Sequence, residues 1–280
     1  MNPQLNIDLH THSTHSDGSL TPAELVAHAA AAGVQVLALT DHDSVAGLED
    51  AQRSTQALGL RLVPGVEISA SWRSQAVHVL GLWIDPCALQ LRSMLDSQAE
   101  RRRLRMRRMC GRLAKLGLPG GELLAAVEAR PGVPTRAHLA TALAEAGHVA
   151  TAEGAFRKYL SAGRPAHVSE DWPAIDSVVG RILAAGGVAA LAHPLRYRLS
   201  AGARRQLLAG FAAAGGTALE VVSGGSGAHQ AESCAQLALR YGFLGSIGSD
   251  FHNPQVSWNP MGRLAKLPDC VMPVWRGHGL

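Results

Sequence analysis

The chain has 280 residues and a formal net charge of +4, and 47% of its residues are hydrophobic. This length and apolar content are enough to bury a sizeable core in one domain with an insertion. Aromatic residues make up only 4% of the chain, which excludes an extended surface for stacking the bases of a long single strand. The positive charge suits an anionic substrate without requiring one.

We expect a cytoplasmic protein that is neither secreted nor membrane-spanning. No basic and then apolar signal segment opens the sequence, and an arginine, paired glycines and a histidine interrupt the apolar run at residues 178–195. The cysteines are far apart and form no CxxC pair, which is typical of reduced thiols. They are Cys87, Cys110, Cys234 and Cys270.

Strand and helix patterns alternate in the first part of the chain. Strands are predicted at residues 6–13, 34–40, 60–66 and 77–84. A helix is predicted over residues 22–32, because Thr21 can act as its N-cap, Pro22 suits its first position and Glu24 completes a capping box.

Between residue 85 and about residue 168 the strand pattern gives way to helical sequence rich in Ala, Arg and Leu. Strands return at residues 188–192, 218–222 and 244–248, which gives seven in all. The alternation at both ends of the chain predicts an α/β fold built from parallel β/α units, interrupted by a helical insertion.

Histidine and acidic residues recur at or beside the ends of the predicted strands. In NIDLHTHSTHSDG, His10 and His12 stand two residues apart, and a strand points residues with this spacing to one face, where both can bind one metal ion. Nine nitrogen and oxygen ligands without a cysteine favour Mn, Fe, Zn or Mg and are enough for two or three divalent ions. The candidate ligands are His10, His12, Asp17, His42, Glu67, His78, His193, Asp250 and His252.

Basic residues in the helical segment and after the fifth strand are candidates for binding a phosphate. Arg196 lies shortly after His193, and its guanidinium can bind two phosphate oxygens in a fork. Arg136 and Lys158 would add a second phosphate contact if the helical segment folds over the site. We interpret the run RRRLRMRR at residues 101–108 as a solvated helix face. His229, in the loop SGGSGAH, is a candidate for shaping a base pocket, and the alternative is a glycine-rich turn into a helix.

The motifs DLHTHSxxSDG, TDHD, GxExS, AHP and GSDFH, with a histidine about ten residues after GxExS, resemble the polymerase and histidinol phosphatase (PHP) superfamily of metal-dependent phosphoesterases. The resemblance implies a distorted seven-stranded β/α barrel with a two- or three-metal centre at the carboxyl ends of its strands. We therefore divide the chain into a first barrel part, residues 1–88, a helical insertion or lid domain, residues 89–167, and a second barrel part, residues 168–280.

The same resemblance assigns the metal ligands to three sites. His10, His12, Glu67 and Asp250 would hold one ion. The second ion would be held by Glu67, His78 and His193, and the third by Asp17, His42 and His252. Manganese is the favoured metal, with iron, zinc and magnesium as alternatives. Asp8, Asp41 and Asp43 flank the ligands, and we expect them to orient the imidazoles.

Within the superfamily, the helical insertion and the segments TRAHLA, FRKYL and AHPLRY are similar to the bacterial subgroup that acts on nucleoside 3′,5′-bisphosphates and on short RNA 5′ ends. This similarity implies hydrolysis of a 3′-phosphate, for example from adenosine 3′,5′-bisphosphate. Glu67 would bridge two metals, and Arg196 and Arg136 would stabilise charge in the transition state. The expected partner is a small phosphorylated substrate, with no obligatory protein partner.

Three alternatives stay open. Histidinol-phosphate phosphatase would share the metal centre and differ only in its substrate pocket. An amidohydrolase would usually need a bridging carboxylated lysine, and no lysine occurs in the strand-end motifs. A non-catalytic nucleic-acid-binding module would normally lack some of the ligands, whereas this chain has them all.

Overall fold

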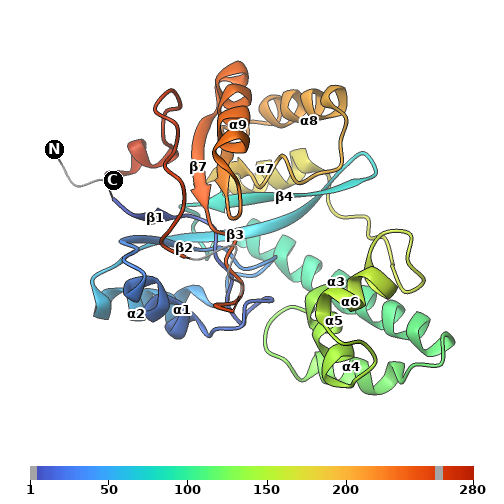
Figure 1. Cartoon of the computed structure of the whole chain (residues 1–280). Helices are drawn as coiled ribbons and strands as arrows, with labels where there is room; N and C mark the ends of the chain where they lie inside the picture. Colours follow the sequence, from blue (N-terminus) through green and yellow to red (C-terminus); the bar gives the residue numbers. More distant parts are fainter. Residues whose placement is uncertain (1–4, 256–260) are drawn as a thin grey trace.

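The computed structural model describes residues 5–255 and 261–280 and contains one sheet whose strands follow one another in sequence order (Figure 1). The sheet curls into a barrel, because the backbone after the first strand bonds to the last one: the amide of Leu9 donates to the carbonyl of Ile247 at 3.0 Å. The seven predicted strands are thereby confirmed. They are β1 (Ile7–Asp8), β2 (Val36–Leu39), β3 (Arg61–Trp72), β4 (Gln75–Leu82), β5 (Val188–Leu191), β6 (Ala218–Ser223) and β7 (Leu244–Gly248).

The expectation that all strand pairs are parallel is wrong for β4, which runs antiparallel to both β3 and β5. Trp72 pairs with Gln75 at the end of this hairpin, so only Arg73 and Ser74 connect the two strands. Two residues cannot form the long crossover that a parallel pair requires. Arg73 takes a positive φ of 54°, which allows the tight reversal.

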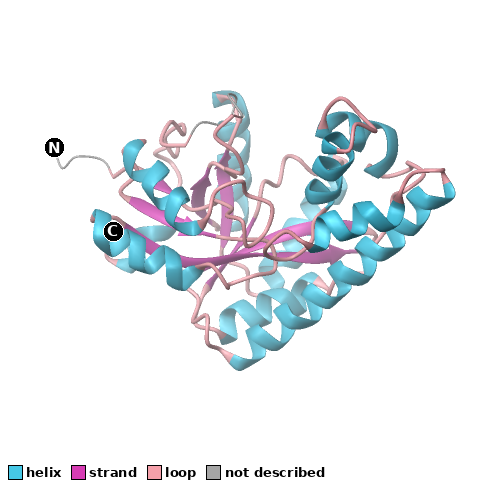
Figure 2. Ribbon diagram, turned by 90° about the horizontal axis from the view of Figure 1, so that it is seen from below, coloured by secondary structure: helices cyan, strands magenta, loops and turns pink. Residues whose placement is uncertain are grey.

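Helices cover the outside of the sheet, and Figure 2 shows the strands in magenta with helices on their flanks. The first helix begins as predicted, with a capping box between Thr21 and Glu24. The helices of the barrel are α1 (Pro22–Ala31), α2 (Leu48–Leu58), α7 (Ile175–Ala184), α8 (Ala201–Ala213), α9 (Ala228–Tyr241) and the short η2 (Val274–His278). No helix in the described ranges is both long enough and apolar enough to cross a membrane.

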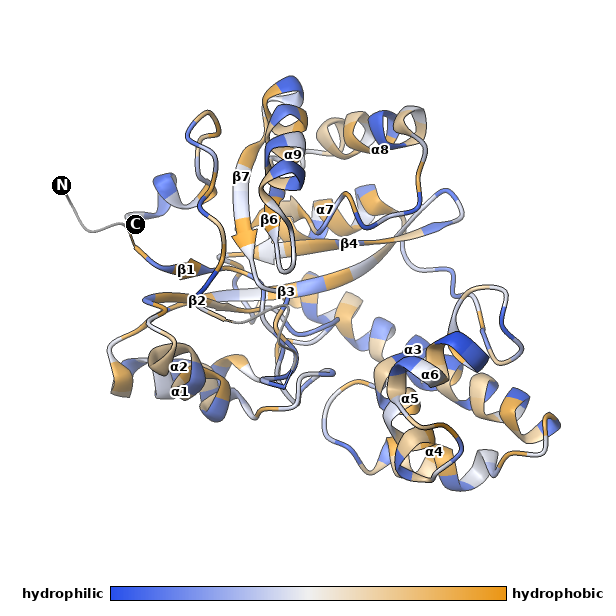
Figure 3. Cartoon of the chain, in the orientation of Figure 1, coloured by the Kyte–Doolittle hydropathy of each residue, from blue (hydrophilic) through white to orange (hydrophobic). Residues whose placement is uncertain are grey.

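The main core lies between the strands and these helices. Leu9, Ile68, Leu80 and Leu191 are buried in it together with Phe211 of α8. Strand β4 is mostly orange in the hydropathy colouring of Figure 3, as expected for a strand buried on both faces. Burial of this apolar surface fixes the barrel that presents the polar residues at its rim.

The helical insertion has a second core of its own. Met109, Leu113, Leu139 and Leu160 are buried in this cluster, and in Figure 1 the insertion helices lie to one side of the barrel. The cluster supports the predicted division at residues 88 and 167, which stays a prediction. The insertion helices are α3 (Leu89–Lys115), α4 (Gly120–Glu128), α5 (Arg136–Glu145), α6 (Ala152–Ala155) and η1 (Phe156–Leu160).

Candidate active site

The nine candidate ligands gather at one rim of the barrel around the carboxylate of Glu67. Most of them follow strands whose carboxyl ends share this rim. His78 lies near the beginning of β4, but it pairs with Ser69 of β3. Because β4 is antiparallel to its neighbours, its first half lies at the same rim as their last residues. Glu67 lies within β3 rather than after it, since that strand runs on to Trp72.

Both oxygens of Glu67 face imidazole nitrogens. Its Oε2 lies 3.4 Å from Nε2 of His10, 3.4 Å from Nε2 of His12 and 2.8 Å from Nδ1 of His42. Its Oε1 lies 2.9 Å from Nδ1 of His78 and 3.1 Å from Nε2 of His193. This side chain is fully buried. A carboxylate in this position can bridge metal ions.

Three groups of side chains at this rim have donor atoms close enough together to hold an ion. They are His10, His12, Glu67 and Asp250; His12, Asp17, His42 and His252; and His42, Glu67 and His78. The first group matches the first predicted site, and the second adds His12 to the predicted third site. In the remaining group His42 stands where His193 was expected, although His193 contacts the same carboxylate.

The donor atoms fit metal ions better than they fit one another. Five of them are buried and form no hydrogen bond of good geometry among the described residues, even where two of them lie 2.8 Å apart, and a buried polar atom without a good partner is costly. These atoms are His10 Nε2, His12 Nε2, Asp17 Oδ1, His42 Nδ1 and Glu67 Oε2. Imidazole nitrogens and carboxylate oxygens, with no thiolate, suit Mn, Fe, Zn or Mg.

Charges within the cluster shift the pKa values of its members in both directions. Burial opposes a charge on His10, His42 and His252, yet the nearby carboxylates raise the pKa of each, that of His252 to about 10. Burial opposes ionisation of Glu67, yet the surrounding imidazoles hold the pKa of its carboxyl well below the usual range. Asp17 and Asp250 show the same balance and the same direction. Burial and the charge of His252 lower the pKa of His12 to about 3. Ionised carboxylates and a neutral imidazole are the forms that bind a cation.

The comparisons with known proteins agree with this geometry. The family model of the PHP domain matches residues 8–130. A 5′-3′ exoribonuclease from Haemophilus influenzae is 40% identical over 272 residues, which cover 96% of this chain and 97% of the relative. A 3′,5′-nucleoside bisphosphate phosphatase from Chromobacterium violaceum is 40% identical over 274 residues, covering 97% and 95%. The chain belongs to the PHP family.

A solved structure also has the same fold as this PHP chain. It is described as an amidohydrolase from Chromobacterium violaceum with bound sulfate and no metal. It superposes with a TM-score of 0.91 at 39% identity and covers 97% of this chain and 95% of its own. The predicted seven-stranded PHP barrel is thus confirmed along nearly the whole chain.

Glu220 is a residue of the PHP site that the sequence analysis missed. Its Oε1 lies 2.8 Å from Nδ1 of His10, and its Oε2 accepts the backbone amide of His193 at 2.6 Å and the hydroxyl of Ser223 at 2.9 Å. The carboxylate therefore orients two candidate ligands. The sequence contained one indication of this role: Glu220 is the acidic residue inside the apolar strand ALEVVS, and a charge in a buried strand needs partners.

The three aspartates that were expected to orient imidazoles bind other groups. Asp8 accepts the backbone amides of His10 and Ser249, and Asp41 accepts the hydroxyls of Ser13 and Ser16. Ser16 Oγ lies 3.4 Å from Nδ1 of His12, so Asp41 reaches an imidazole only through this serine. The described contacts of Asp8 and Asp41 are with backbone amides and hydroxyls at the strand ends, so a role in orienting the imidazoles stays a prediction.

Asp43 joins the insertion to the barrel. It follows His42, has a positive φ of 47°, and its Oδ2 accepts Nε of Arg102 at 2.7 Å. Its Oδ1 accepts the amide of Ser69 at 2.8 Å and the side-chain amide of Gln98 at 3.1 Å. Helix α3 is thereby tied to the loop that carries a candidate ligand.

A cavity of about 520 Å³ opens between this rim and the insertion. Asp17, His42, His78 and His193 line one side of it. The remaining wall includes four arginines, which are Arg102, Arg105, Arg136 and Arg196. Sequence analysis named two of these, Arg136 and Arg196, and the structure brings both to the same cavity as the ligands.

The arginine run on α3 is split between two faces of the helix. Arg103 and Arg107 are exposed and pair with acidic residues, as the solvated-face interpretation expects. Arg102 and Arg105 point into the cavity, so the interpretation is wrong for these two. Residues three apart share a helix face, so the spacing of Arg102 and Arg105 already indicated that both side chains point the same way.

Arg105 and Arg136 carry charge that is poorly compensated, whereas Arg102 is paired with Asp43. Burial, together with the nearby guanidinium groups of Arg136 and Arg102, lowers the pKa of Arg105 to about 10. Burial and Arg102 also lower the pKa of Arg136. Glu170 lines the same cavity, but Nη1 of the outward Arg108 lies 3.9 Å from its carboxylate. Such a wall favours an anion in the cavity.

Two predicted substrate residues lie elsewhere. Lys158 places its Nζ 4.9 Å from the ring centre of Tyr159 and is not part of the cavity wall. His229 is exposed in the first turn of α9 and does not line this cavity either. Their roles in substrate binding stay predictions.

Proposed function

We propose that this PHP chain is a hydrolase that removes the 3′-phosphate from nucleoside 3′,5′-bisphosphates, such as adenosine 3′,5′-bisphosphate, and leaves the 5′-nucleotide. The observation that carries the proposal is one cavity whose lining includes both metal-ligand residues and four arginines. A substrate with two phosphates can contact both kinds of residue. The Chromobacterium violaceum relative is named for this reaction.

The ligand groups would hold two or three divalent ions, and we propose manganese. When bound, such ions neutralise phosphate charge and lower the pKa of a bound water to near neutrality. Glu67 would bridge ions through its two oxygens. His10 and His12 would hold their ion with Nε2 atoms, and Glu220 would fix the His10 ring from its other nitrogen.

Arg196 is proposed to stabilise charge on the scissile phosphate. Its guanidinium contacts the carboxylate of Asp250 and donates to the carbonyl of Gly224 at 2.6 Å. The group is thus held beside a candidate metal ligand at the edge of the cavity. A planar guanidinium presents several donors to a phosphate and keeps its charge at any working pH.

Arg136 is proposed to bind the second phosphate, with Arg105 beside it. Among the described residues no carboxylate pairs with either guanidinium within ion-pair distance. Two desolvated cations without a counter-charge are costly in the free protein. A phosphate dianion would remove this cost, so the same residues would select substrates with a phosphate at the 5′ position.

The relative from Haemophilus influenzae supports a second activity on short RNA with a 5′-phosphate. In such a substrate the 5′-phosphate would occupy the arginine wall, while the following phosphodiester lies at the metal groups. Histidinol phosphate is a weaker candidate, because it has a single phosphate and would leave the arginines without an anion. A non-catalytic role is disfavoured by the complete set of ligands.

The test is phosphate release by manganese-loaded protein. Adenosine 3′,5′-bisphosphate is compared with 3′-AMP, 5′-AMP and histidinol phosphate, and His12→Ala is the control for the metal groups. We expect the bisphosphate to give the highest kcat/KM and 3′-AMP to follow at least about tenfold lower, since it lacks the second phosphate. Preference for histidinol phosphate would overturn the proposal. We further propose that the protein works in the cytoplasm without an obligatory protein partner.

A further inference from the structure

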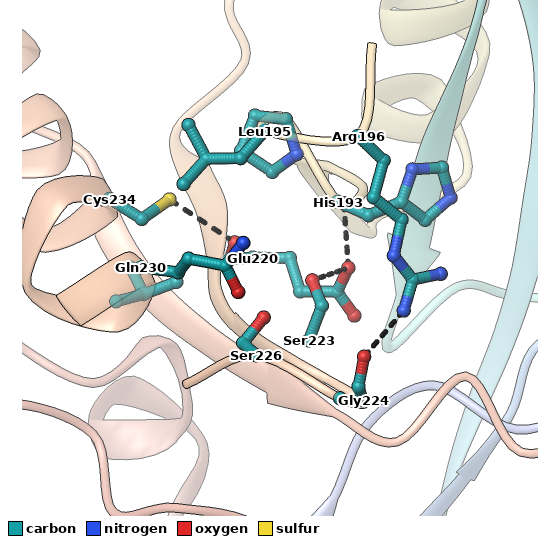
Figure 4. A pocket seen from close by; sticks show the side chains of 12 residues that line it. His193, Leu195, Arg196, Glu220, Ser223, Gly224, Ser226, Gln230 and Cys234 are labelled. Atoms are coloured by element: carbon teal, nitrogen blue, oxygen red, sulfur yellow. Dashed lines mark hydrogen bonds between the residues drawn. The ribbon is translucent and has the colours of Figure 1, made fainter. Parts of the chain in front are cut away.

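A second, smaller cavity of about 210 Å³ adjoins the site (Figure 4). It lies between the segment after β5 and the glycine-rich loop between β6 and α9. His193 and Arg196 line both this cavity and the larger one. The smaller cavity therefore borders the metal groups through these two side chains.

The walls of the smaller cavity differ in chemistry. Pro194, Leu195 and Val221 supply apolar surface. Gly224 and Gly225 supply bare backbone, and Gly225 has a φ of +73°, a conformation that a side chain would strain. A flat ring can approach such a backbone closely.

Polar groups lie at the edge of the cavity. Gln230 accepts the amide of Gly227 through Oε1 at 3.2 Å, which leaves its amide nitrogen free to donate. In Figure 4 the Gln230 and Ser226 side chains lie close together at the edge of the pocket, across from Leu195. The hydroxyl of Ser226 can donate or accept. Apolar faces with a few polar groups at one edge are typical of a site for a heteroaromatic ring.

The charges of this cavity exclude a second phosphate. Glu220 lines it with a buried carboxylate. The guanidinium of Arg196 is directed at Asp250 and Gly224, on the border with the larger cavity, where it is assigned to the scissile phosphate. Cys234, whose Sγ donates to the carbonyl of Glu220 at 3.4 Å, closes the remaining side with a neutral thiol. A neutral ligand group fits these walls and an anion does not.

We propose that this smaller cavity, bounded by Leu195, Gly224, Gly225, Ser226 and Gln230, is a subsite for the nucleobase of the substrate. The inference rests on the proposed function, because it takes the substrate to be a nucleotide whose phosphate lies at the metal groups. The base lies between Leu195 and the glycine backbone, and its polar edge meets Ser226 and Gln230. The subsite adds binding energy for nucleotides over sugar phosphates that have no base.

The experiment compares substrates with and without a base. Wild-type protein is assayed with adenosine 3′,5′-bisphosphate and with the abasic analogue that has hydrogen at C1′. Leu195→Trp fills the cavity, and Leu239→Trp, at an exposed residue of α9 outside the cavity, is the matched control. Gln230→Ala removes the polar contact without filling the cavity. Thermal unfolding of each variant checks that it folds.

We expect Leu195→Trp to raise KM for the adenosine substrate about tenfold and to leave KM for the abasic analogue nearly unchanged. Gln230→Ala is expected to change the ratio of the two KM values by a few-fold, and Leu239→Trp to leave this ratio as in the wild type. Equilibrium dialysis of metal-free protein with 5′-AMP and with ribose 5-phosphate provides a readout besides activity. Wild-type protein is expected to prefer 5′-AMP, and Leu195→Trp to lose this preference.

The failures of the two proposals are distinguishable. Equal kcat/KM for the two bisphosphates in wild-type protein, with equal binding of 5′-AMP and ribose 5-phosphate, would overturn the base subsite and leave the proposed function standing. Release of phosphate from neither bisphosphate would overturn the proposed function. In that case the dialysis comparison alone still decides whether the cavity binds a base.

Discussion

Glu220 and His10 form a buried pair in which Oε1 of the carboxylate lies 2.8 Å from Nδ1 of the imidazole. The pair connects β6 to the segment after β1, at opposite ends of the sequence. Because Nδ1 donates to Glu220, Nε2 is left as the metal-binding nitrogen and is directed at Glu67 and Asp250. Glu220 thus determines which nitrogen of His10 can bind a metal.

We predict that Glu220→Gln lowers the affinity for Mn²⁺ roughly 10- to 100-fold. The amide keeps the size of the side chain but can no longer stabilise the bound imidazole as a carboxylate does. Titration of metal-free protein with Mn²⁺, followed by calorimetry, measures the change. The exposed Glu232→Gln on α9 is the matched control and should bind Mn²⁺ as the wild type does. Equal affinities for the two variants would contradict the role given to Glu220.

The pair of Arg102 and Asp43 predicts a large loss of stability when only one partner is removed. Both side chains are buried, and Arg102 also donates to Ser69 Oγ at 2.9 Å. Arg102→Met leaves Asp43 buried without its counter-charge, which should lower the free energy of unfolding by about 3–5 kcal/mol. Denaturant unfolding measures this difference.

Two further variants test whether the loss of stability in Arg102→Met comes from the unpaired charge of Asp43. Arg103→Met, on the exposed face of the same helix, should change stability by less than about 1 kcal/mol. Adding Asp43→Asn to Arg102→Met should recover part of the loss, because the unpaired charge is then gone. A double variant that is as unstable as the sum of both single variants would show that the two residues act independently.

Arg136→Met should weaken substrate binding without lowering the free energy of unfolding. Arg136 is half-buried, lies near Arg102, and has its Cζ 5.8 Å from the ring centre of Phe156. Without a bound anion its charge is a cost, so the variant should unfold at the same denaturant concentration as the wild type or a higher one. KM for the bisphosphate should rise at least about tenfold, because the second phosphate loses its partner. A variant with unchanged KM would remove Arg136 from the substrate site.

The sequence was sufficient for the seven strands and for the convergence of the nine ligands, because both follow from local patterns. An HxH motif after an apolar run, or a histidine at the end of VQVLAL, is visible without any knowledge of distant contacts. The antiparallel direction of β4 was not visible in these patterns, because the predicted strands ended at residue 66 and resumed at residue 77, whereas β3 runs on to Trp72 and only Arg73 and Ser74 connect it to β4. Local patterns therefore predicted the strands better than their directions.

Contacts between distant segments were harder to predict. The partners of Glu220 are 210 residues away in His10 and 27 residues away in His193. The inward face of Arg102 depends on where α3 packs against β3, which no local motif contains. Lys158 was a sequence candidate because it is basic, but its position is determined by the packing of η1 in the insertion core. Long-range packing decides which basic residues face the cavity.

The four cysteines should divide into two reactive and two protected thiols. Cys87 and Cys270 are exposed, whereas Cys110 and Cys234 are buried. Burial, with the nearby carboxylate of Glu128, raises the pKa of the Cys110 thiol to about 11, and burial with Glu220 raises that of Cys234 to about 12. Because the thiolate is the reacting form, a disulfide reagent at neutral pH should modify two thiols in native protein and four in denatured protein.

A variant with Cys87→Ser and Cys270→Ser retains only the two buried thiols, so its rate of modification measures local opening of the structure. We expect almost no modification of this variant in the native state, at a rate that rises steeply with denaturant as the buried thiols become exposed. Cys234 lies on α9 beside the smaller cavity, so slow modification of this thiol reports opening of the wall that carries Gln230. Rapid modification of a third thiol in the native wild-type protein would contradict the burial of Cys110 on α3 or of Cys234 on α9.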